Sequence, residues 1–202
     1  MKQFLFVMFL PVFFSCNIFA FSGAGSGTDI EPYQITNRAQ IEEVNEDLSA
    51  HYKLMNDINL TPDNATSIGT YNSAVIAPDT DTNENFQGTK FTGTFDGNGK
   101  KIIGLTIDAS ESCVGLFGYV DTDAAITNLD IENCSIVGSG YAGILTAYNR
   151  GNISNIYSTG IVTSSADTST ATAGGLIGCN NGGTISSSRS DVNVTSSGYN
   201  SL

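Results

Sequence analysis

The sequence predicts an all-β fold, a parallel β-helix with a short helix-containing cap at its N-terminal end. A glycine-flanked apolar stretch occurs three times, and a second short strand follows each copy. Short strands separated by Gly and Asn turns cannot bury an apolar face alone, whereas stacked coils can. Such a repeat without a helical period is typical of a parallel β-helix. The apolar stretches are residues 114–119, 142–147 and 174–179, and the following strands are residues 126–129, 153–156 and 185–188.

The composition limits the partners of this chain. It has 202 residues, enough for one sizeable domain, and a net charge of −12 with only 14% charged residues. Because an acidic chain repels phosphate backbones, we expect no nucleic-acid partner, and the same reasoning disfavours anionic membrane surfaces. The acidity is interpreted mainly as a contribution to solubility.

Residues 1–20 are predicted to be a signal peptide. The apolar run Phe4–Phe14 is too short to span a bilayer stably, and Ala20 closes a plausible cleavage site. We therefore expect a secreted or cell-surface protein with no transmembrane span in the mature chain. A lipoprotein attached through Cys16 is the alternative, which is disfavoured by Phe13 at a position that usually holds a small aliphatic residue.

Residues 21–60 are predicted to form the N-terminal cap. Asn37 followed by Gln40 is a helix-start signal, and apolar residues then recur at helical spacing. This pattern predicts a short amphipathic helix over about residues 38–48. Residues 52–60 alternate between apolar and polar side chains, which predicts a strand.

Residues 61–90 are interpreted as a polar loop or insertion. Pro62, Pro78 and an Asp-, Thr- and Asn-rich run over residues 79–85 interrupt the strand pattern there. The strand signal returns with Phe-Thr-Gly-Thr-Phe-Asp-Gly-Asn-Gly over residues 91–99, whose Asp-Gly and Asn-Gly pairs favour tight turns.

Residues 91–202 are predicted to be the β-helix repeats. Aligning Ile102 with Ile126, Ile153 and Ile185 gives steps of 24, 27 and 32 residues. Alternate residues of a strand point inward, and this alternation predicts the core. The predicted core residues are Leu116, Ile126, Leu129, Ile131, Ile144, Ile153, Ile156, Leu176 and Ile185.

The repeats are expected to be cut short at their C-terminal end. The sequence Ser-Gly-Tyr at residues 197–199 matches residues 139–141, which precede the next glycine-flanked strand, and no capping sequence follows it. An open last coil exposes an unpaired strand edge. We therefore expect a truncated product, a missing continuation, or end-to-end association through this coil.

The glycine-flanked stretches resemble a known repeat. Gly115-Leu-Phe-Gly, Gly143-Ile-Leu and Gly175-Leu-Ile-Gly look like the GLUG motif of bacterial secreted and surface proteins, and the order of the upstream segments is similar from about residue 25. The resemblance implies a right-handed β-helix that belongs to an adhesin, a large surface protein or a peptidase precursor. The second copy departs from the motif, because Thr146 stands where the second Gly is expected.

The sequence shows no catalytic, cofactor-binding or metal-binding set. His51 is the only histidine, which excludes an H-E-x-x-H zinc motif and any His-based triad. The acidic run that begins at Asp79 resembles a calcium loop, but Glu84 and Lys90 stand where Gly and the closing Glu are required. The second candidate calcium loop begins at Asp96 and fails in the same way.

Cysteines are expected to serve as small apolar fillers within the coils. Cys113, Cys134 and Cys179 remain after removal of the signal peptide, and their spacing matches no zinc pattern. Cys113 with Cys134 is the one pair to test for a disulfide.

These observations favour an exported, non-enzymatic module that acts as a secreted or cell-surface scaffold or adhesin. The alternative is a carbohydrate-active enzyme resembling a polysaccharide lyase or glycosidase, or a carbohydrate-binding module, with a surface polysaccharide or another protein as partner. An enzyme needs at least two acids and a base in one groove, and Asp108 and Asp130 are candidates to stack on adjacent coils. A sugar-stacking surface is a further hypothesis, built from Tyr71, Tyr119, Tyr141, Tyr148, Tyr157 and Tyr199.

Overall fold

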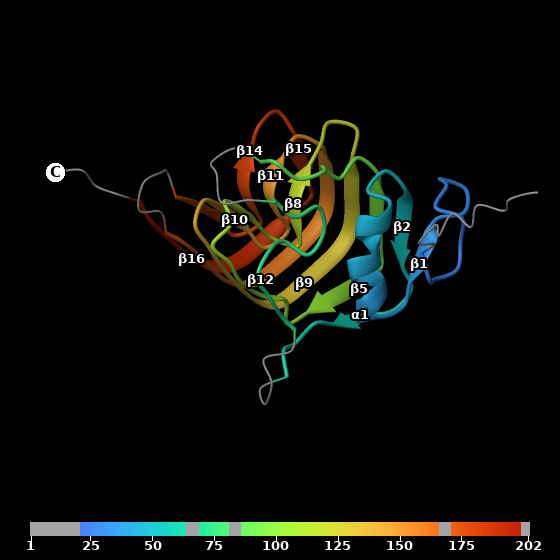
Figure 1. Cartoon of the computed structure of the whole chain (residues 1–202), viewed down its shortest axis with the longest axis horizontal. Coiled ribbons are helices and arrows are strands. Elements are labelled where there is room, and N and C mark those ends of the chain that lie inside the picture. The colour runs from blue at the N-terminus through green and yellow to red at the C-terminus, as the bar shows by residue number, and fades with distance from the viewer. Residues whose placement is uncertain (1–20, 64–68, 81–85, 166–170, 199–202) are drawn as a thin grey trace, which may run out of the picture.

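The computed structural model describes residues 21–63, 69–80, 86–165 and 171–198 of the chain. Within these residues the strands wind into a parallel β-solenoid of about three turns, and one short α-helix lies near the N-terminal end (Figure 1). The predicted all-β, parallel solenoid fold with a helix-containing cap is therefore confirmed. The predicted signal peptide, Cys16 included, lies outside the described residues. No helix in the described part of the chain has the length and apolar character needed to cross a bilayer.

Three parallel sheets form the walls of the solenoid. The large sheet has ten strands, and two sheets of three strands complete each coil. In Figure 1, β5, β9 and β12 run side by side as the long curved strands of the large sheet. The large sheet contains β1 (Tyr33–Ile35), β2 (His51–Leu54), β3 (Ile58–Asn59), β4 (Thr70–Tyr71), β5 (Thr94–Ile103), β6 (Thr106–Asp108), β9 (Ala125–Gly138), β12 (Asn152–Ser165), β15 (Thr184–Ser186) and β16 (Arg189–Ser197). The small sheets contain β7 (Cys113–Val114), β10 (Tyr141–Gly143) and β13 (Thr172–Gly174), and β8 (Phe117–Val120), β11 (Thr146–Asn149) and β14 (Ile177–Asn180).

The register of the large sheet stacks inward-pointing residues in rows. Ile126 pairs with Ile153, and Ile153 pairs with Ile185, as the repeat predicts. The expected start of this row at Ile102 is wrong, because Phe95 is the residue that pairs with Ile126. Ile102 pairs instead with Ile131. The reason is a register shift between Asp96 and Lys100, where the Gly-Asn-Gly turn adds residues that no neighbouring strand matches.

The second glycine-flanked stretch contains one extra residue compared with the first. Thr146 pairs with Phe117 on one side and with Ile177 on the other. Ala147, not Thr146, therefore stands level with Gly118 and the corresponding glycine of the third copy. The expected substitution at Thr146 is thus corrected by the strand register.

The core runs along the inside of the solenoid. Leu116, Ile126, Leu129, Ile131 and Ile144 are 0% exposed, and the other predicted core residues of the first two repeats, Ile153 and Ile156, are at most 2% exposed. The two predicted core residues of the third repeat differ. Leu176 is partly buried and Ile185 is 45% exposed, because no described strand covers the open side of their coil.

The cap begins as expected and ends earlier. The Asn37 side chain accepts a hydrogen bond from the Gln40 backbone N–H at 3.2 Å, which caps the helix. The predicted helix over residues 38–48 consists of α1 (Arg38–Glu42) and a 3₁₀ turn, η1 (Glu43–Glu46). It stops there because Asp47 turns the chain, with its carboxylate accepting from the Ser49 N–H at 3.0 Å.

Part of the expected polar loop over residues 61–90 belongs to the solenoid wall. Residues 74–77 are buried, β4 pairs with β6, and Ile76 forms a bridge with Phe117. The cap fastens this segment, because the Asn45 amide donates to the Val75 carbonyl at 2.7 Å and its oxygen accepts from the Ala77 N–H at 2.9 Å. Residues 64–68 and 81–85 lie outside the described part of the chain.

Candidate functional site

A groove of about 490 Å³ opens beside the first coil, where the turn at residues 29–32 faces β2 and β5. It gathers three carboxylates, one lysine and the histidine from segments that are distant in sequence. We call it the N-terminal groove. Its lining residues are Asp29, Ile30, Glu31, Pro32, Gln34, His51, Tyr52, Lys53, Met55, Thr94 and Asp96.

Asp96 lies between Lys53 and the turn that follows β5's first residues. One carboxylate oxygen lies 3.5 Å from the Lys53 Nζ. The other accepts hydrogen bonds from the Asn98 N–H at 2.8 Å and from the Asn128 amide at 2.9 Å. Both oxygens of Asp96 are therefore engaged in holding the turn, which accounts for the Asp-Gly-Asn-Gly sequence that resembled a calcium loop.

Asparagines extend this contact along the solenoid. The Asn155 amide donates to the Asn128 side-chain oxygen at 2.9 Å. Both residues have left-handed backbone conformations with φ of 56°, which asparagine tolerates better than most residues. The sequence analysis missed this ladder, although the recurrence of Asn between two strand residues, in Thr127-Asn-Leu and Ser154-Asn-Ile, is the signal that could have found it.

The opposite wall of the groove carries the other carboxylates. Glu31 accepts a hydrogen bond from the Ser26 hydroxyl at 3.0 Å, and Asp29 lies two residues before it in the same turn. His51 is hydrogen-bonded through Nδ1 to the Thr94 hydroxyl at 2.8 Å. The groove thus combines the residue types that the carbohydrate alternative requires, in a cavity that the sequence analysis did not locate.

The outer face of the large sheet presents a second arrangement. Lys101, Asp130, Tyr157 and Arg189 stand at the same level of four successive strands, and we call them the outer row. The Arg189 guanidinium lies 4.2 Å from the centre of the Tyr157 ring. Lys101 donates to Glu132 at 2.7 Å, and this hydrogen bond raises the pKa of the Lys101 ammonium above its ordinary value.

The expected stacking of Asp108 on Asp130 does not occur. Asp108 pairs with Val137, whereas Asp130 pairs with Lys101 and Tyr157. The shifted register that begins at the turn after Asp96 separates the two carboxylates, so they form no acid pair.

The six tyrosines do not form one surface. Tyr119 and Tyr148 stack on each other with ring centres 4.7 Å apart, and Tyr141 meets Tyr148 edge-on at 5.7 Å. Tyr71 belongs to the cap, where its hydroxyl donates to Glu42 at 2.8 Å and burial raises its pKa to about 12. Tyr157 belongs to the outer row, and Tyr199 lies outside the described residues.

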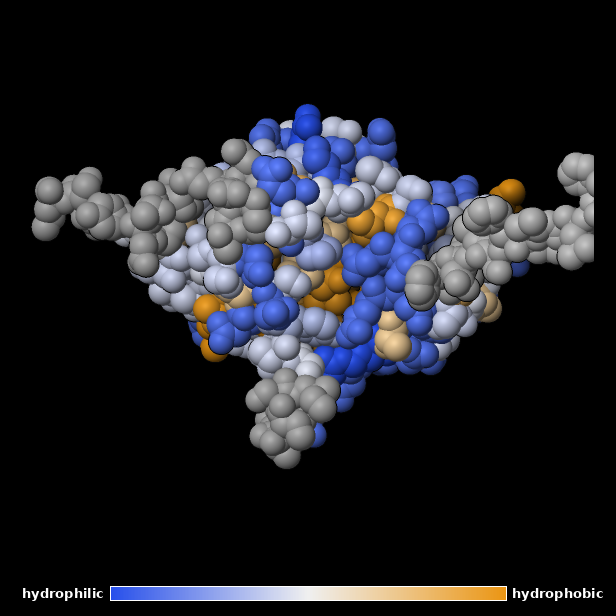
Figure 2. Space-filling view, viewed as in Figure 1, coloured by the Kyte–Doolittle hydropathy of each residue, from blue (hydrophilic) through white to orange (hydrophobic). Residues whose placement is uncertain are grey.

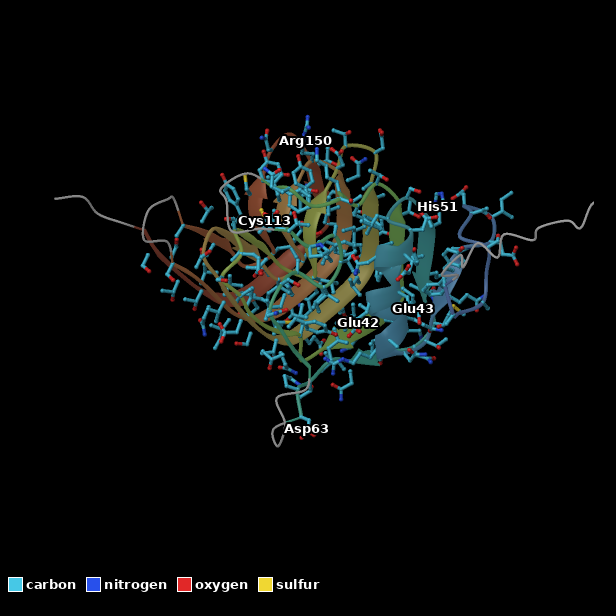
Figure 3. All side chains as sticks on the ribbon, viewed as in Figure 1. Glu42, Glu43, His51, Asp63, Cys113 and Arg150 are labelled. Atoms are coloured by element: carbon cyan, nitrogen blue, oxygen red, sulfur yellow. The ribbon has the colours of Figure 1, made fainter. Side chains whose placement is uncertain are left out.

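The cysteines are free. Cys113 and Cys134 are buried and form no disulfide, and Cys179 is partly exposed. Burial raises the pKa of the Cys113 thiol and of the Cys134 thiol to about 12. In Figure 3, Cys113, His51 and Arg150 lie well apart, so these side chains do not form one reactive cluster.

Thiol reactivity is expected to follow burial. At pH 8 we expect iodoacetamide to modify Cys179 in the folded mature chain and to leave Cys113 and Cys134 unmodified, because their raised pKa values keep them protonated. Denaturant should release all three. Intact-mass measurement before and after unfolding checks this, and rapid native modification of Cys134 would contradict it. Stability is expected to fall as the pH rises above the ordinary thiol pKa of 9.0, because only the unfolded thiols then ionise.

No group of three or more His, Cys, Asp or Glu side chains suited to a metal ion occurs in the described ranges of the chain. Asp79, the first residue of the calcium-like run, is buried and accepts hydrogen bonds from the Thr80 N–H at 2.9 Å and the Gln87 N–H at 2.8 Å. It therefore closes a loop, of which residues 81–85 lie outside the described part. Hydrophilic residues cover most of the face seen in Figure 2, with small apolar patches between them.

Comparison with known proteins relates the chain to solenoid proteins. No family model matches it. It is 33% identical to halomucin from Haloquadratum walsbyi over 165 residues, which cover 80% of this chain and 2% of halomucin. The chain therefore corresponds to a small part of that relative. Its structure is similar to the crystal structure of a putative immunoglobulin A1 protease from Bacteroides ovatus, with a TM-score of 0.52 and 20% identity over 85% of this chain and 61% of that chain. At this identity the similarity concerns the fold alone.

Proposed function

We propose that the mature chain is an exported, non-enzymatic β-solenoid module that serves as a secreted or cell-surface scaffold or adhesin. The outer row is the observation that carries this proposal. A cation, a carboxylate, an aromatic ring and a second cation lie level on four paired strands. Because strand pairing rather than a loop positions them, the surface is ordered before any ligand arrives, which lowers the entropic cost of binding.

The GLUG assignment forms part of the same proposal. Gly143 pairs with Gly174, and Ala142 pairs with Val114, so the glycines of the three copies stand level on adjacent coils. A Cβ at Gly143 would lie 2.5 Å from the Thr146 carbonyl oxygen. Close packing between coils thus supports a structural role for these glycines, which is what the motif implies.

A surface polysaccharide is the partner that the outer row fits best. The hydroxyl groups of a sugar can bond to both the lysine ammonium and the aspartate carboxylate, and the Tyr157 ring offers an apolar edge. The net charge of −12 disfavours a polyanion. Another protein with a mixed-charge surface remains the second kind of partner for the same row.

The carbohydrate alternative is supported by the N-terminal groove. Asp29, Glu31 and Asp96 line it together with Lys53 and His51. These are the residue types that glycosidases and lyases use as acid, base or charge stabiliser. Because the contacts of Asp96 hold a turn, Glu31 and Asp29 are the carboxylates to test for chemistry.

A glycan array separates the two surfaces. We expect the protein of residues 21–202 to bind surface polysaccharides, with Tyr157→Ala losing roughly tenfold in affinity, about 1.4 kcal/mol. Lys53→Ala, in the groove, is the matched control and should retain binding. Retained binding by Tyr157→Ala together with loss by Lys53→Ala would transfer the site to the groove.

A turnover assay on the same polysaccharides tests the enzyme alternative. We expect no new reducing ends or unsaturated products. Release of such products that disappears in Glu31→Gln but persists in Tyr157→Ala would overturn the non-enzymatic proposal.

A further inference from the structure

β16 is a long strand with one unpaired edge. It has nine residues, and each of them pairs with β12, from Arg189 with Tyr157 to Ser197 with Ser165. Among the described residues no strand pairs with the other edge of β16. An exposed edge of this length is a template for pairing with another chain.

The inward-pointing side chains of β16 continue the core and leave it open. Val194 pairs with Val162, which is 0% exposed, yet Val194 itself is 44% exposed. Ile185, which belongs to the row of Ile126 and Ile153, is 45% exposed for the same reason. The open side of this coil therefore presents apolar residues that elsewhere in the solenoid lie beneath another coil.

The sequence of β16 is self-complementary about Asn193. Reading outward from it, Val192 matches Val194. Ser190 matches Ser196 in the same inward row, and the charged Asp191 matches Thr195. Two copies related by a two-fold axis form an interface in which each residue meets its symmetry mate, so a palindromic strand suits antiparallel self-pairing. No like charges face each other in this register, and the valines meet in pairs.

The other end of the solenoid is already closed. The lead-in segment pairs with β1, because the Gln34 N–H donates to the Ala24 carbonyl at 2.7 Å. Phe21 stacks on Tyr33 with ring centres 4.7 Å apart. A head-to-tail contact would need an open edge at both ends, so the symmetric contact of two β16 strands is favoured over an open filament.

We propose that two copies of this chain associate through β16, which joins their large sheets in antiparallel fashion about an axis through Asn193. Val192 of one copy then packs against the partner's Val194, and the two apolar cores become continuous. This interaction is independent of the outer row and of the N-terminal groove.

Site-specific cross-linking tests the register. In a Cys179→Ser background we expect Asn193→Cys to form a disulfide-linked dimer, because directly opposed residues have Cα atoms about 4.5–5.5 Å apart, within reach of a disulfide. Asp191→Cys is the matched control on the same face of the same strand. Its symmetry mate lies four residues further along, roughly 13 Å away, so it should not cross-link.

Sedimentation of the unmodified protein of residues 21–202 gives the second readout. We expect a dimer that Val194→Lys converts to a monomer, and Val137→Lys, which alters a 37% exposed valine of β9, should leave it intact. If Val194→Lys fails to fold, the cross-linking pair still decides. A monomer with no Asn193→Cys cross-link, or equal cross-linking at both positions, would overturn the proposal. Further coils that cover β16 in a longer chain would produce the first of these outcomes.

Discussion

Replacing Ile126 with alanine is expected to lower the free energy of unfolding by about 3 kcal/mol, within the usual range for buried isoleucine. Ile126 is 0% exposed and lies between Phe95 and Ile153 in adjacent coils. The three removed carbons leave a cavity that neighbouring coils cannot close, because strand pairing holds their backbones at a set spacing.

Ile185→Ala is the matched control for this prediction. It is the same residue type in the same row, one coil beyond Ile153, but it is 45% exposed. We expect it to cost less than about 1 kcal/mol. Urea unfolding followed by circular dichroism, at protein concentrations low enough to avoid association, measures both. Equal costs would show that the row does not form the core as described.

Replacing Gly160 with alanine is expected to cost about 2–4 kcal/mol, because two separate effects add. Its φ of 145° is unfavourable for a residue with a Cβ. A Cβ would also lie 2.2 Å from the Cys134 carbonyl oxygen on the paired strand. Gly160 stands at the irregularity in the pairing of β12 with β9, so the backbone cannot move away without breaking register.

Gly182→Ala separates the two effects. Gly182 also has a positive φ, of 86°, but a Cβ there would meet no atom within 4 Å. The expected cost is about 1 kcal/mol, from backbone conformation alone. Thermal and urea unfolding of the two variants give the comparison. If Gly160→Ala were no more destabilising than Gly182→Ala, the close approach of β12 to β9 would be ruled out.

The proposals place binding on different parts of one scaffold. The outer row lies on the side of the large sheet, the N-terminal groove lies beside the first coil, and β16 lies at the other end. Variants at Tyr157, Lys53 and Val194 therefore report on separate surfaces. A loss of glycan binding in a variant that stays dimeric would distinguish the failure of a ligand site from the failure of assembly.

The candidate sites were less predictable than the fold. Lys53 and Asp96 meet across 43 residues of sequence, and no local pattern links them. The outer row depends on the register of β5 against β9, which the turn after Asp96 shifts. A proposed acid pair, Asp108 with Asp130, was wrong for this reason, since the length of a turn decides which residues of neighbouring coils stand level.

The sequence by itself determined that this chain is a solenoid and which side of each strand faces inward. Alternation is a local property, so Ile126, Ile153 and Ile156 could be placed in the core without knowledge of any partner. The Asn37 cap is equally local, because its hydrogen bond spans three residues.

Only the tertiary structure decided which coil residues stack on each other, where the solenoid stays open, and which charged side chains share a groove. These outcomes depend on turn lengths and on contacts between distant segments, such as the Asn155 to Asn128 bond across 27 residues. Ile185 shows the difference most directly. Its sequence pattern is that of a core residue, yet its exposure is set by the absence of a covering strand among the described residues, which no local pattern encodes.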